Sequence, residues 1–432
     1  MTSGGLELLD LEPKETNVAG LQHTALTRFV LQPKSYSLGA SYEIPRLDSR
    51  WLDLFVDGNV IFERATGSPE GSYGSASIRQ PLYSSRAEWA WSTGMSWRDQ
   101  VTRRYVDAAV TTYTPTLPGA TPVPWVYRER TISEQAKVTR SFGWENKQDF
   151  SLGVGIARSV YRVPDGAGDA ASVAEFTRVA VPVGEARVGP FAQWHAYTSD
   201  FLRTIDLDTL SLQEDNRLGH DLWLRAYTSF RGLGSTRDLV GAYGAAAYAI
   251  PLRDGIARGA VSSVVEADHD GISDGSLRFD LGAATPRLGF GRFVFAMTAL
   301  DRFENYLNAH SFLGGDSLLR GYPTRFLTGR DLFAANVEFR SPAFGFSSVP
   351  LGAVAFYDVG DAPSALDTFD AKHSVGVGLR AVFPQIERAA LRLDVGFPLS
   401  TKPLPSDVPP VEIFFAFSQA IALPTVGDGL AP

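Results

Sequence analysis

The feature that most constrains this chain is an alternation of apolar and polar side chains, with a period of two residues, along its whole length. Alternate residues of a β-strand point to opposite faces of a sheet, so the pattern predicts strands with one apolar face. Clusters of Gly, Pro, Asn, Asp and Ser, such as residues 164–169, separate the segments and favour turns. No helical period competes, so we expect an all-β, antiparallel fold. The clearest segments are Trp51–Glu63, Ser72–Leu82, Ala87–Trp97, Ser151–Val160, Leu222–Arg231, Leu239–Pro251, Ile256–Val265, Leu277–Ala283, Arg292–Leu300, Leu332–Arg340, Gly352–Gly360, Val375–Phe383, Leu391–Leu399 and Val411–Ile421.

The polar faces of these segments favour a membrane barrel over a soluble sandwich. No window approaches the roughly 18 consecutive apolar residues that a helix needs to cross a bilayer, so a spanning chain must form a closed barrel. In Leu391–Leu399 the apolar face opposes Arg392 and Asp394, and paired opposite charges and glycine are typical of a wet lumen. We therefore predict a transmembrane β-barrel of about 16 strands, or 18 if Ala25–Leu31 and Ser35–Glu43 are separate strands. A soluble β-sandwich that binds a partner is the alternative.

Three tryptophans lie on one face of a predicted strand. Trp89, Trp91 and Trp97 share one parity, and Trp89 and Trp97 stand about 26 Å apart along an extended strand. That spacing matches the height of the apolar band of a barrel, where aromatic girdles line both edges. Ordinary core packing would explain the same residues.

Composition limits the chemistry of the chain. It has 432 residues, 44% of them hydrophobic, with a net charge of −8 and no cysteine. The sequence shows no basic cluster, so we expect no nucleic-acid partner. Without cysteine there are no disulfides or thiolate metal sites. The six histidines are scattered and no Gly-x-Ser-x-Gly motif occurs, so we expect no metal, cofactor, catalytic residue or enzymatic activity. The triplet Asp268–Asp270 keeps a hydrolase as a minor alternative.

The last third of the chain carries an ordered set of motifs. The segment Phe312–Tyr322 reads Phe-Leu-Gly-Gly-Asp-Ser-Leu-Leu-Arg-Gly-Tyr, and a strand with Glu338 follows it. Next come Phe356-Tyr-Asp358-Val-Gly360 and a closing segment, Phe414–Ile421. Gly314, Gly315 and Gly321 allow sharp reversals of the loop. The planar fork of Arg320 suits two carboxylates, and Glu338 and Asp358 have the parity of the lumen.

In this order the motifs resemble the bacterial surface antigen barrel of the BamA/TamA superfamily of outer-membrane assembly factors. The resemblance covers about 110 residues in detail. It implies that a lid loop, at about residues 312–331, folds into the barrel. Within the lid, the motif residues are Gly314, Gly315, Leu319, Arg320, Gly321 and Tyr322. The lid would dock Arg320 on Glu338 and Asp358, and Phe356, Asp358 and Gly360 form the F-x-D-x-G strand.

The resemblance also implies a function and a location. In this superfamily the seam between the first and last strands is weak and opens sideways, which offers an edge on which a client strand pairs. We expect an integral protein of the bacterial outer membrane that aids insertion of outer-membrane proteins or translocates polypeptides. Its partners would be membrane lipid, client polypeptides and periplasmic accessory proteins. A two-partner-secretion transporter or a plain pore of the same superfamily is the alternative.

Both ends of the chain depart from the family pattern. In the closing strand, with Phe415 and Phe417, Ser418 stands where glycine is usual and Ile421 replaces the terminal aromatic residue. We expect residues 1–24 to be a lead-in, 25–421 the barrel and 422–432 a tail. Residues 1–11 are too polar for a signal peptide, and no periplasmic POTRA repeat fits before Ala25. We therefore interpret the chain as the barrel part of a mature or longer protein.

Overall fold

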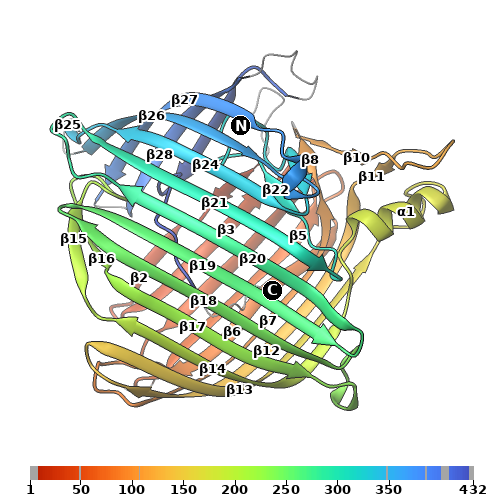
Figure 1. The fold of residues 1–432 in the computed structure, drawn as a ribbon, viewed down its shortest axis with the longest axis horizontal. Helices are drawn as coiled ribbons and strands as arrows, with labels where there is room; N and C mark the ends of the chain where they lie inside the picture. The colour runs from red at the N-terminus through yellow and green to blue at the C-terminus, as the bar shows by residue number, and fades with distance from the viewer. Residues whose placement is uncertain are drawn as a thin grey trace.

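The computed structural model describes residues 8–47, 50–106, 108–346, 349–384, 387–399 and 408–427. One large antiparallel sheet curls around a lumen and confirms the all-β barrel fold (Figure 1). Each long strand pairs with the next long strand along the chain. These strands are β3 (His23–Leu31), β4 (Ser35–Ile44), β5 (Asp53–Glu63), β6 (Pro69–Gln80), β7 (Trp89–Arg103), β12 (Val126–Phe142), β13 (Asn146–Arg162), β14 (Ala186–Thr198), β17 (Gly219–Ser229), β18 (Leu239–Leu252), β19 (Gly255–Asp268), β20 (Gly271–Ala284), β21 (Arg292–Asn305), β24 (Leu332–Arg340), β26 (Val349–Asp361), β27 (Lys372–Phe383), β28 (Glu387–Leu399) and β29 (Glu412–Phe417).

Short elements decorate this wall. Two strands pair with the edge of β3, and β25 pairs with β26. In the described connections lie four small hairpins, one α-helix and two short 3-10 helices. The short elements are β1 (Leu9–Leu11), β2 (Lys14–Val18), β8 (Tyr105–Val106), β9 (Ala109–Val110), β10 (Thr112–Tyr113), β11 (Val123–Pro124), β15 (Phe201–Ile205), β16 (Gln213–Arg217), β22 (Ser311–Leu313), β23 (Leu327–Gly329), β25 (Phe344–Phe346), α1 (Ala170–Ala180), η2 (Arg231–Leu233) and η3 (Leu366–Thr368).

Within the described residues the main sheet has 21 strands, more than the 16 to 18 expected. Three of them, β1, β2 and β25, have five residues or fewer. The number of remaining long strands equals the larger of the two expected numbers, 18. The sequence did not reveal β12 or β14 as clear segments. Charged side chains stand on both faces of β12, as at Arg128, Glu129 and Arg130, so its alternation is hidden.

Helix α1 also differs from expectation, because its first residues follow a cluster that reads as a turn. The side chain of Asp169 caps the helix by accepting hydrogen bonds from the amides of Ala171 and Ser172. None of the described helices has the length and apolar character needed to cross a membrane, a finding that does not bear on strands.

The register of the sheet shows which side chains face outward. On β13, Leu152 and Val154 point away from the lumen and are 70% and 56% exposed. On β27, Val377 and Leu379 do the same, whereas Arg380 points inward and is buried. A soluble sandwich would bury its apolar faces between two sheets. The apolar residues lie on the outer face, which is the arrangement of a barrel in lipid.

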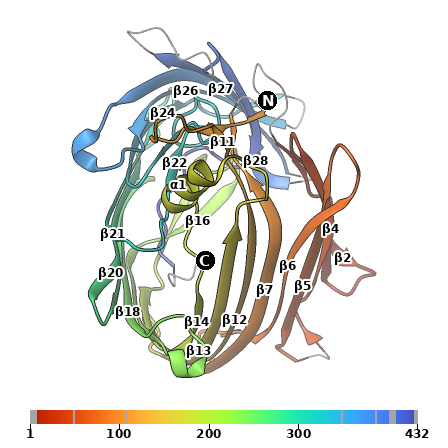
Figure 2. The same ribbon diagram turned by 90° about the vertical axis from the view of Figure 1, so that its right-hand side faces the viewer.

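The two ends of the barrel differ. The end with α1 and β10–β11, called the loop end, carries the long connections 104–125, 163–185 and 306–331 and faces the viewer in Figure 2. The opposite end, called the turn end, has short turns at 143–145 and 253–254, together with the β15–β16 hairpin.

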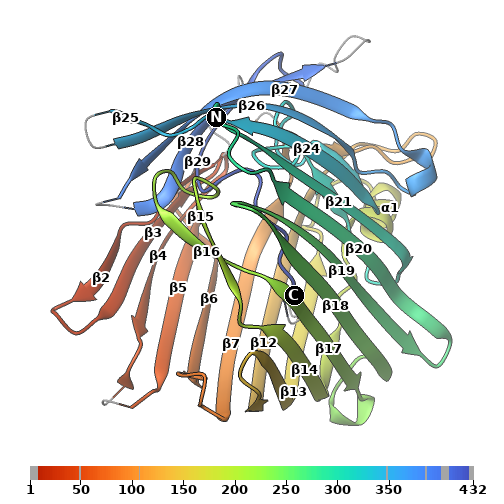
Figure 3. The same cartoon turned by 60° about the vertical axis from the view of Figure 1, so that its left-hand side comes forward.

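The first and last strands of the sheet form its most weakly paired margins. Figure 3 shows the margin with β2 and β3 and the margin with β28 and β29. β1 and β2 each pair with β3 at three positions, and Pro13, which has no amide hydrogen, lies between them. β29 pairs with β28 over six positions, whereas β12 and β13 pair over fifteen. Among the described residues no register joins β29 to β1, β2 or β3. We call this boundary the seam.

Candidate functional site

A loop between β21 and β24 folds back into the barrel, and its residues 312–331 are called the lid. The short strands β22 and β23 form its base. Gly314 and Gly315 turn the chain with φ values of +113° and +103°, a region that favours glycine. Beyond them Leu319 and Tyr322 are buried with Leu313 and Leu332 in a small apolar cluster. The lid therefore has a core of its own that holds the Arg-Gly-Tyr motif against the wall.

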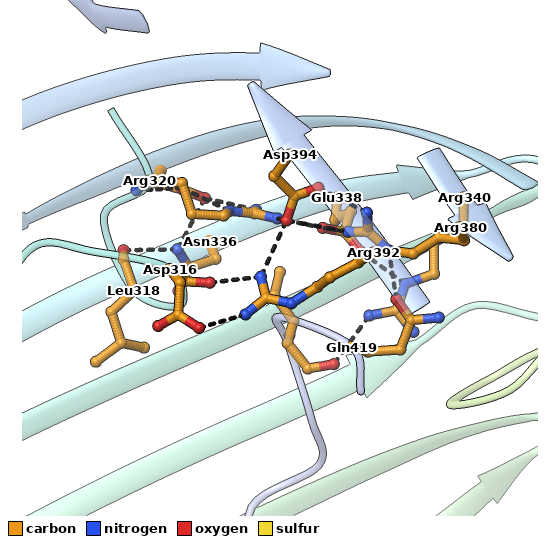
Figure 4. A network of polar contacts seen from close by, with 12 residues as sticks. Asp316, Leu318, Arg320, Asn336, Glu338, Arg340, Arg380, Arg392, Asp394 and Gln419 are labelled. Atoms are coloured by element: carbon orange, nitrogen blue, oxygen red, sulfur yellow. Dashed lines mark hydrogen bonds and ion pairs between the residues drawn. The ribbon is translucent and has the colours of Figure 1, made fainter. Parts of the chain in front are cut away.

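Arg320 is fully buried and contacts both carboxylates that the sequence singled out, Asp358 and Glu338, the second of which is labelled in Figure 4. Its Nε and Nη2 atoms donate to the two carboxylate oxygens of Asp358, over 3.0 and 2.9 Å, and its backbone amide donates to Asp358 as well. Nη1 donates to Glu338 over 2.5 Å. The guanidinium group also stacks 3.6 Å from the ring centre of Phe356. The planar fork is thus satisfied on three sides.

The surrounding wall extends this contact into a charge cluster. Asp394 accepts from Arg380 over 2.6 Å and from Arg392 over 2.9 Å. Arg340 donates to Glu338, and Arg392 also pairs with Asp316 of the lid. We call the full set the lumen cluster. It consists of Arg320, Arg340, Arg380 and Arg392 with Asp316, Glu338, Asp358 and Asp394, so its four positive charges balance its four negative charges.

Glycines of the lid and wall allow the backbones to approach closely. A Cβ atom on Gly321 would stand 2.5 Å from the Cβ of Ser374, and one on Gly396 would stand 1.8 Å from the carbonyl oxygen of Arg320. A Cβ on Gly360 would collide with Leu313 of the lid base at 2.8 Å. These contacts explain why the Arg-Gly-Tyr and F-x-D-x-G motifs need glycine where they have it.

Burial decides the strength of this docking. Arg320, Glu338, Asp358 and Asp394 are each fully buried. Removing one partner from a desolvated ion cluster leaves an uncompensated charge and costs about 3–5 kcal/mol, against roughly 1 kcal/mol for an exposed pair. Loss of any one of these partners should therefore weaken the docking of the lid more than loss of an exposed ion pair would.

The closing strand is shorter than the sequence predicts. Phe415 and Phe417 point outward on β29, which ends at Phe417. Ser418 and Ile421, which the sequence placed in this strand, lie beyond it. Ser418 has a φ of +70°, a left-handed conformation that turns the chain into the lumen.

Residues 418–424 then occupy the lumen, and this stretch is called the C-terminal segment. Ile421 packs in a cluster with Ala284 of β20 and Val294 of β21. Arg340 donates to the carbonyl oxygen of Ile421 over 2.9 Å, and Arg380 donates to the side chain of Gln419 over 2.9 Å. The C-terminal segment is thereby tied to the lumen cluster.

The β15–β16 hairpin fills the turn end of the lumen. Leu207 lies in the same cluster as Ile421, and Leu210 packs with Val382 of β27. Arg340 donates to the carbonyl oxygen of Leu207, and Arg292 donates to that of Ile205 over 2.9 Å. One arginine of the lumen cluster, Arg340, thus touches the hairpin as well as the C-terminal segment.

At the loop end, α1 and β10–β11 form a small cap around Val123 and Phe176. Arg104 of the cap donates to the carbonyl oxygens of Arg325 and Phe326 in the lid. Asn308, just before the lid, donates to Val181 at the end of α1 over 2.9 Å. The lid is therefore held by the wall on one side and by the cap on the other.

No protein-family model matches the sequence. No curated protein matches it either. Among solved structures, the chain is similar to CdiB from Acinetobacter baumannii, with a TM-score of 0.45 and 9% identity over 95% of this chain and 58% of that one. It is similar to BamA from Haemophilus ducreyi lacking POTRA domains 1–3, with a TM-score of 0.45 and 11% identity over 95% and 74%. Pseudomonas aeruginosa OpdQ gives a TM-score of 0.37 and 10% identity over 95% and 91%. The chain spans less than two thirds of the length of the CdiB chains.

Sequence reasoning missed several members of the site. It placed Arg392 and Asp394 on the polar face of β28 but did not connect them to the lid. It also placed Arg340 and Arg380 on the polar faces of their strands, with the parity of Glu338, and did not connect them to the lid either. The contacts of the C-terminal segment and the β15–β16 hairpin have no local sequence signal, because they depend on how loops enter the lumen.

The triplet Asp268–Asp270 lies at the turn after β19, at the loop end. Its ligand-type atoms come within 4.8 Å of one another. Asp268 accepts from Arg237 over 3.2 Å and from the amide of Asp270 over 3.0 Å. His269 and Asp270 are exposed. The geometry is that of a turn stabilised by its first aspartate.

Proposed function

We propose that this chain is an integral β-barrel of the bacterial outer membrane that aids insertion of outer-membrane proteins or translocates polypeptides through its lateral seam. The observation that carries the proposal is the contrast between the seam and the rest of the wall. The sheet ends in ladders of only three and six paired positions, whereas strands within the wall pair over as many as fifteen. The described interior ladders run from seven to fifteen positions, and no described register joins β29 to β1, β2 or β3. Each backbone hydrogen bond contributes about 0.5–1.5 kcal/mol, so the three-position ladders of β1 and β2 separate at a lower cost than an interior pair of strands.

The location follows from the outer face. The outward-pointing leucines and valines of β13 and β27 form an apolar surface that requires lipid. The longer connections at the loop end support an orientation with that end outside the cell, since outer-membrane barrels have long external loops and short periplasmic turns. The partners are membrane lipid and client polypeptides, and the proposal includes no catalytic step or cofactor.

A client strand would pair with the edge of β3. β1 and β2 cover this edge with two short ladders, so a longer client strand would gain more backbone hydrogen bonds than it displaces. In this proposal a client strand displaces β1 and β2. Until then these two strands protect the edge of β3 from unspecific pairing and aggregation.

A reversible disulfide tests this role. Leu11 and Phe29 are directly opposed on β1 and β3, at a separation suited to a disulfide, and the chain has no native cysteine. In liposomes, the Leu11→Cys/Phe29→Cys protein should accelerate folding of an urea-unfolded outer-membrane barrel when reduced and lose that acceleration when oxidised. The matched control is Thr139→Cys/Ser151→Cys, whose hydroxyls lie 2.7 Å apart inside the wall. Equal rates in both redox states of the first pair would refute the role of the β3 edge.

The alternative is an exporter or plain pore that passes material through the lumen. Its strongest prediction is a large conductance once the lid is removed. The β15–β16 hairpin and the C-terminal segment also occupy the lumen, and this favours the seam over the lumen as the route.

A further inference from the structure

Positive charge gathers on one part of the outer wall. On β7, β12 and β13, the arginines 103, 128, 130, 158 and 162 all have the outward parity. The outward positions described on β17, β18, β19, β24 and β26 hold no arginine or lysine. The sequence shows no basic run here because three strands contribute the charges. We call these five residues the arginine patch.

The patch lies at the loop end, directly beyond the apolar band. Trp97 of β7 is opposite Ile132 of β12, and Ile132 is opposite Arg158 of β13, so the three form one row across the outer face. On one side of this row are Val154 and Ile156, which are exposed to lipid. On the other side lie the remaining four arginines. Tryptophan marks the interface between hydrocarbon and headgroups, which places the patch at headgroup level.

Neighbouring carboxylates neutralise only part of the positive charge of the arginine patch. Asp99 is shared by Arg128 and Arg130 over 2.7 and 3.1 Å, and Glu70 pairs with Arg103. Within the described part of the chain, Arg158 and Arg162 have no carboxylate in ion-pair range, and both are exposed. With Glu134, which lies one row deeper on the same face, three carboxylates face five arginines and leave a net charge of +2.

The register also sets two like charges against each other. Arg128 and Arg162 are directly opposed on β12 and β13. Like charges at such positions destabilise a sheet unless an anion lies between them. An arginine fork presents several donors suited to phosphate oxygens, and the patch therefore has the charge and geometry of a phosphate site.

We infer that the arginine patch binds the phosphorylated headgroup of a lipid in the external leaflet, with its acyl chains against the apolar rows of β12 and β13. The inference rests on the proposed membrane placement of the barrel. Headgroup phosphate meets Arg128 and Arg162, Arg158 adds positive charge in the row of Trp97, and the chains lie along Leu152, Val154 and Ile156. The site joins anion recognition to an adjacent apolar surface, which a free phosphate ion would not use.

The test measures lipid retained by the purified protein in detergent, by native mass spectrometry. Phosphatidic acid, diacylglycerol with the same acyl chains, and inorganic phosphate are the three probes. The wild-type protein should retain phosphatidic acid at least about tenfold more tightly than diacylglycerol, because each arginine near a membrane raises the affinity for an anionic lipid by up to about tenfold. Retention of phosphatidic acid should fall at high salt, which screens this attraction.

The variant Arg158→Gln/Arg162→Gln removes the two unpaired arginines and should lower retention of phosphatidic acid by about tenfold or more. The matched control is Arg140→Gln, which removes an outward arginine at the other end of β12, beside Trp89. It should change retention by less than about twofold, because it leaves the patch intact. A gel-shift assay of heat-modifiable migration confirms that each variant is folded.

Three outcomes would overturn the inference. Equal retention of diacylglycerol and phosphatidic acid would show that acyl chains alone bind. Equal loss in the control and the double variant would show a general charge effect. Binding of inorganic phosphate as tight as that of phosphatidic acid would identify a soluble-anion site. Failure of the membrane placement is distinguishable, since that protein would remain soluble without detergent and retain none of the lipids.

Discussion

At the scale of single residues, the lid depends on Arg320. This side chain donates to both Glu338 and Asp358, and it is fully buried. Arg320→Ala should destabilise lid docking by about 3–5 kcal/mol because two buried carboxylates each lose one cationic partner. We expect faster proteolysis of residues 312–331 and lower assembly activity in a barrel that still folds. Arg320→Lys keeps the charge but loses the fork, so its effect should be intermediate. Unchanged protection and activity in Arg320→Ala would count against this role of Arg320.

Ser418 stores backbone strain at the turn from β29 into the lumen. Its φ of +70° costs a non-glycine residue about 1–2 kcal/mol. Ser418→Gly should therefore raise the free energy of unfolding in urea by about 1 kcal/mol. Ala416→Gly, within β29, is the matched control and should lower it instead. A loss of stability in Ser418→Gly would show that the hydroxyl, not the backbone, matters there.

Residue types and parity predicted part of the site from the sequence. Arg320, Glu338 and Asp358 stand in recognisable motifs, and the structure brings these three together. The roles of Arg340 and Arg380 depend on side chains meeting across the lumen, which parity permits but does not determine. Ile421 illustrates the limit, because its apolar character fits a strand as well as the luminal cluster it joins.

At the scale of elements, the cap depends on a carboxylate in α1. Glu175 accepts hydrogen bonds from the backbone amide and hydroxyl of Thr116 and from the hydroxyl of Tyr113. The amide of Thr116 and then its hydroxyl hold the pKa of Glu175 below its ordinary value of 4.5. A carboxyl with a lowered folded pKa stabilises the fold above its unfolded pKa and loses that contribution as pH falls.

The cap should accordingly loosen as the pH drops below about 4.5. Trp125 packs against Phe176 of α1 and reports this change through its fluorescence, obtained as the difference from a Trp125→Phe protein. In Glu175→Gln the amide oxygen still accepts from Thr116, and the acid transition should disappear. A transition that persists in Glu175→Gln would assign it to another group.

The register of the wall strands predicts which face of the sheet meets lipid. Val377 points outward from β27 and is more than half exposed. Val377→Asp places a charge against lipid and should destabilise the barrel by about 1–3 kcal/mol, less than a basic residue would at the same depth. Urea unfolding in lipid vesicles, with Val377→Leu as the control, measures the difference. Equal stabilities of the two variants would mean that the faces are inverted.

Most long strands were predictable because one face meets lipid and the other a polar lumen, which produces alternation. β12 escaped detection where charges face outward, and those charges include members of the arginine patch. α1 escaped because its capping aspartate belongs to a sequence typical of turns. Charges on the outer face thus hid the strand, and a turn-like sequence at its start hid the helix.

At the scale of the whole molecule, three separate segments occupy the lumen. The lid, the β15–β16 hairpin and the C-terminal segment all contact the lumen cluster or the clusters beside it. Deleting residues 312–330 should therefore raise single-channel conductance only modestly, whereas an exporter would widen greatly. The matched measurement is the same deletion combined with removal of residues 419–432. Full opening on deletion of the lid alone would favour the exporter.

In the proposed function a client strand pairs with the edge of β3 rather than in the lumen. Disulfide trapping measures this most directly, because the native chain contains no cysteine. An unfolded client barrel with one cysteine in its terminal strand is added to liposomes containing either Thr27→Cys, on β3, or Ser262→Cys, which faces the lumen from β19. We predict a mixed disulfide with Thr27→Cys and little with Ser262→Cys. Trapping at the lumen position, with none on β3, would contradict the account.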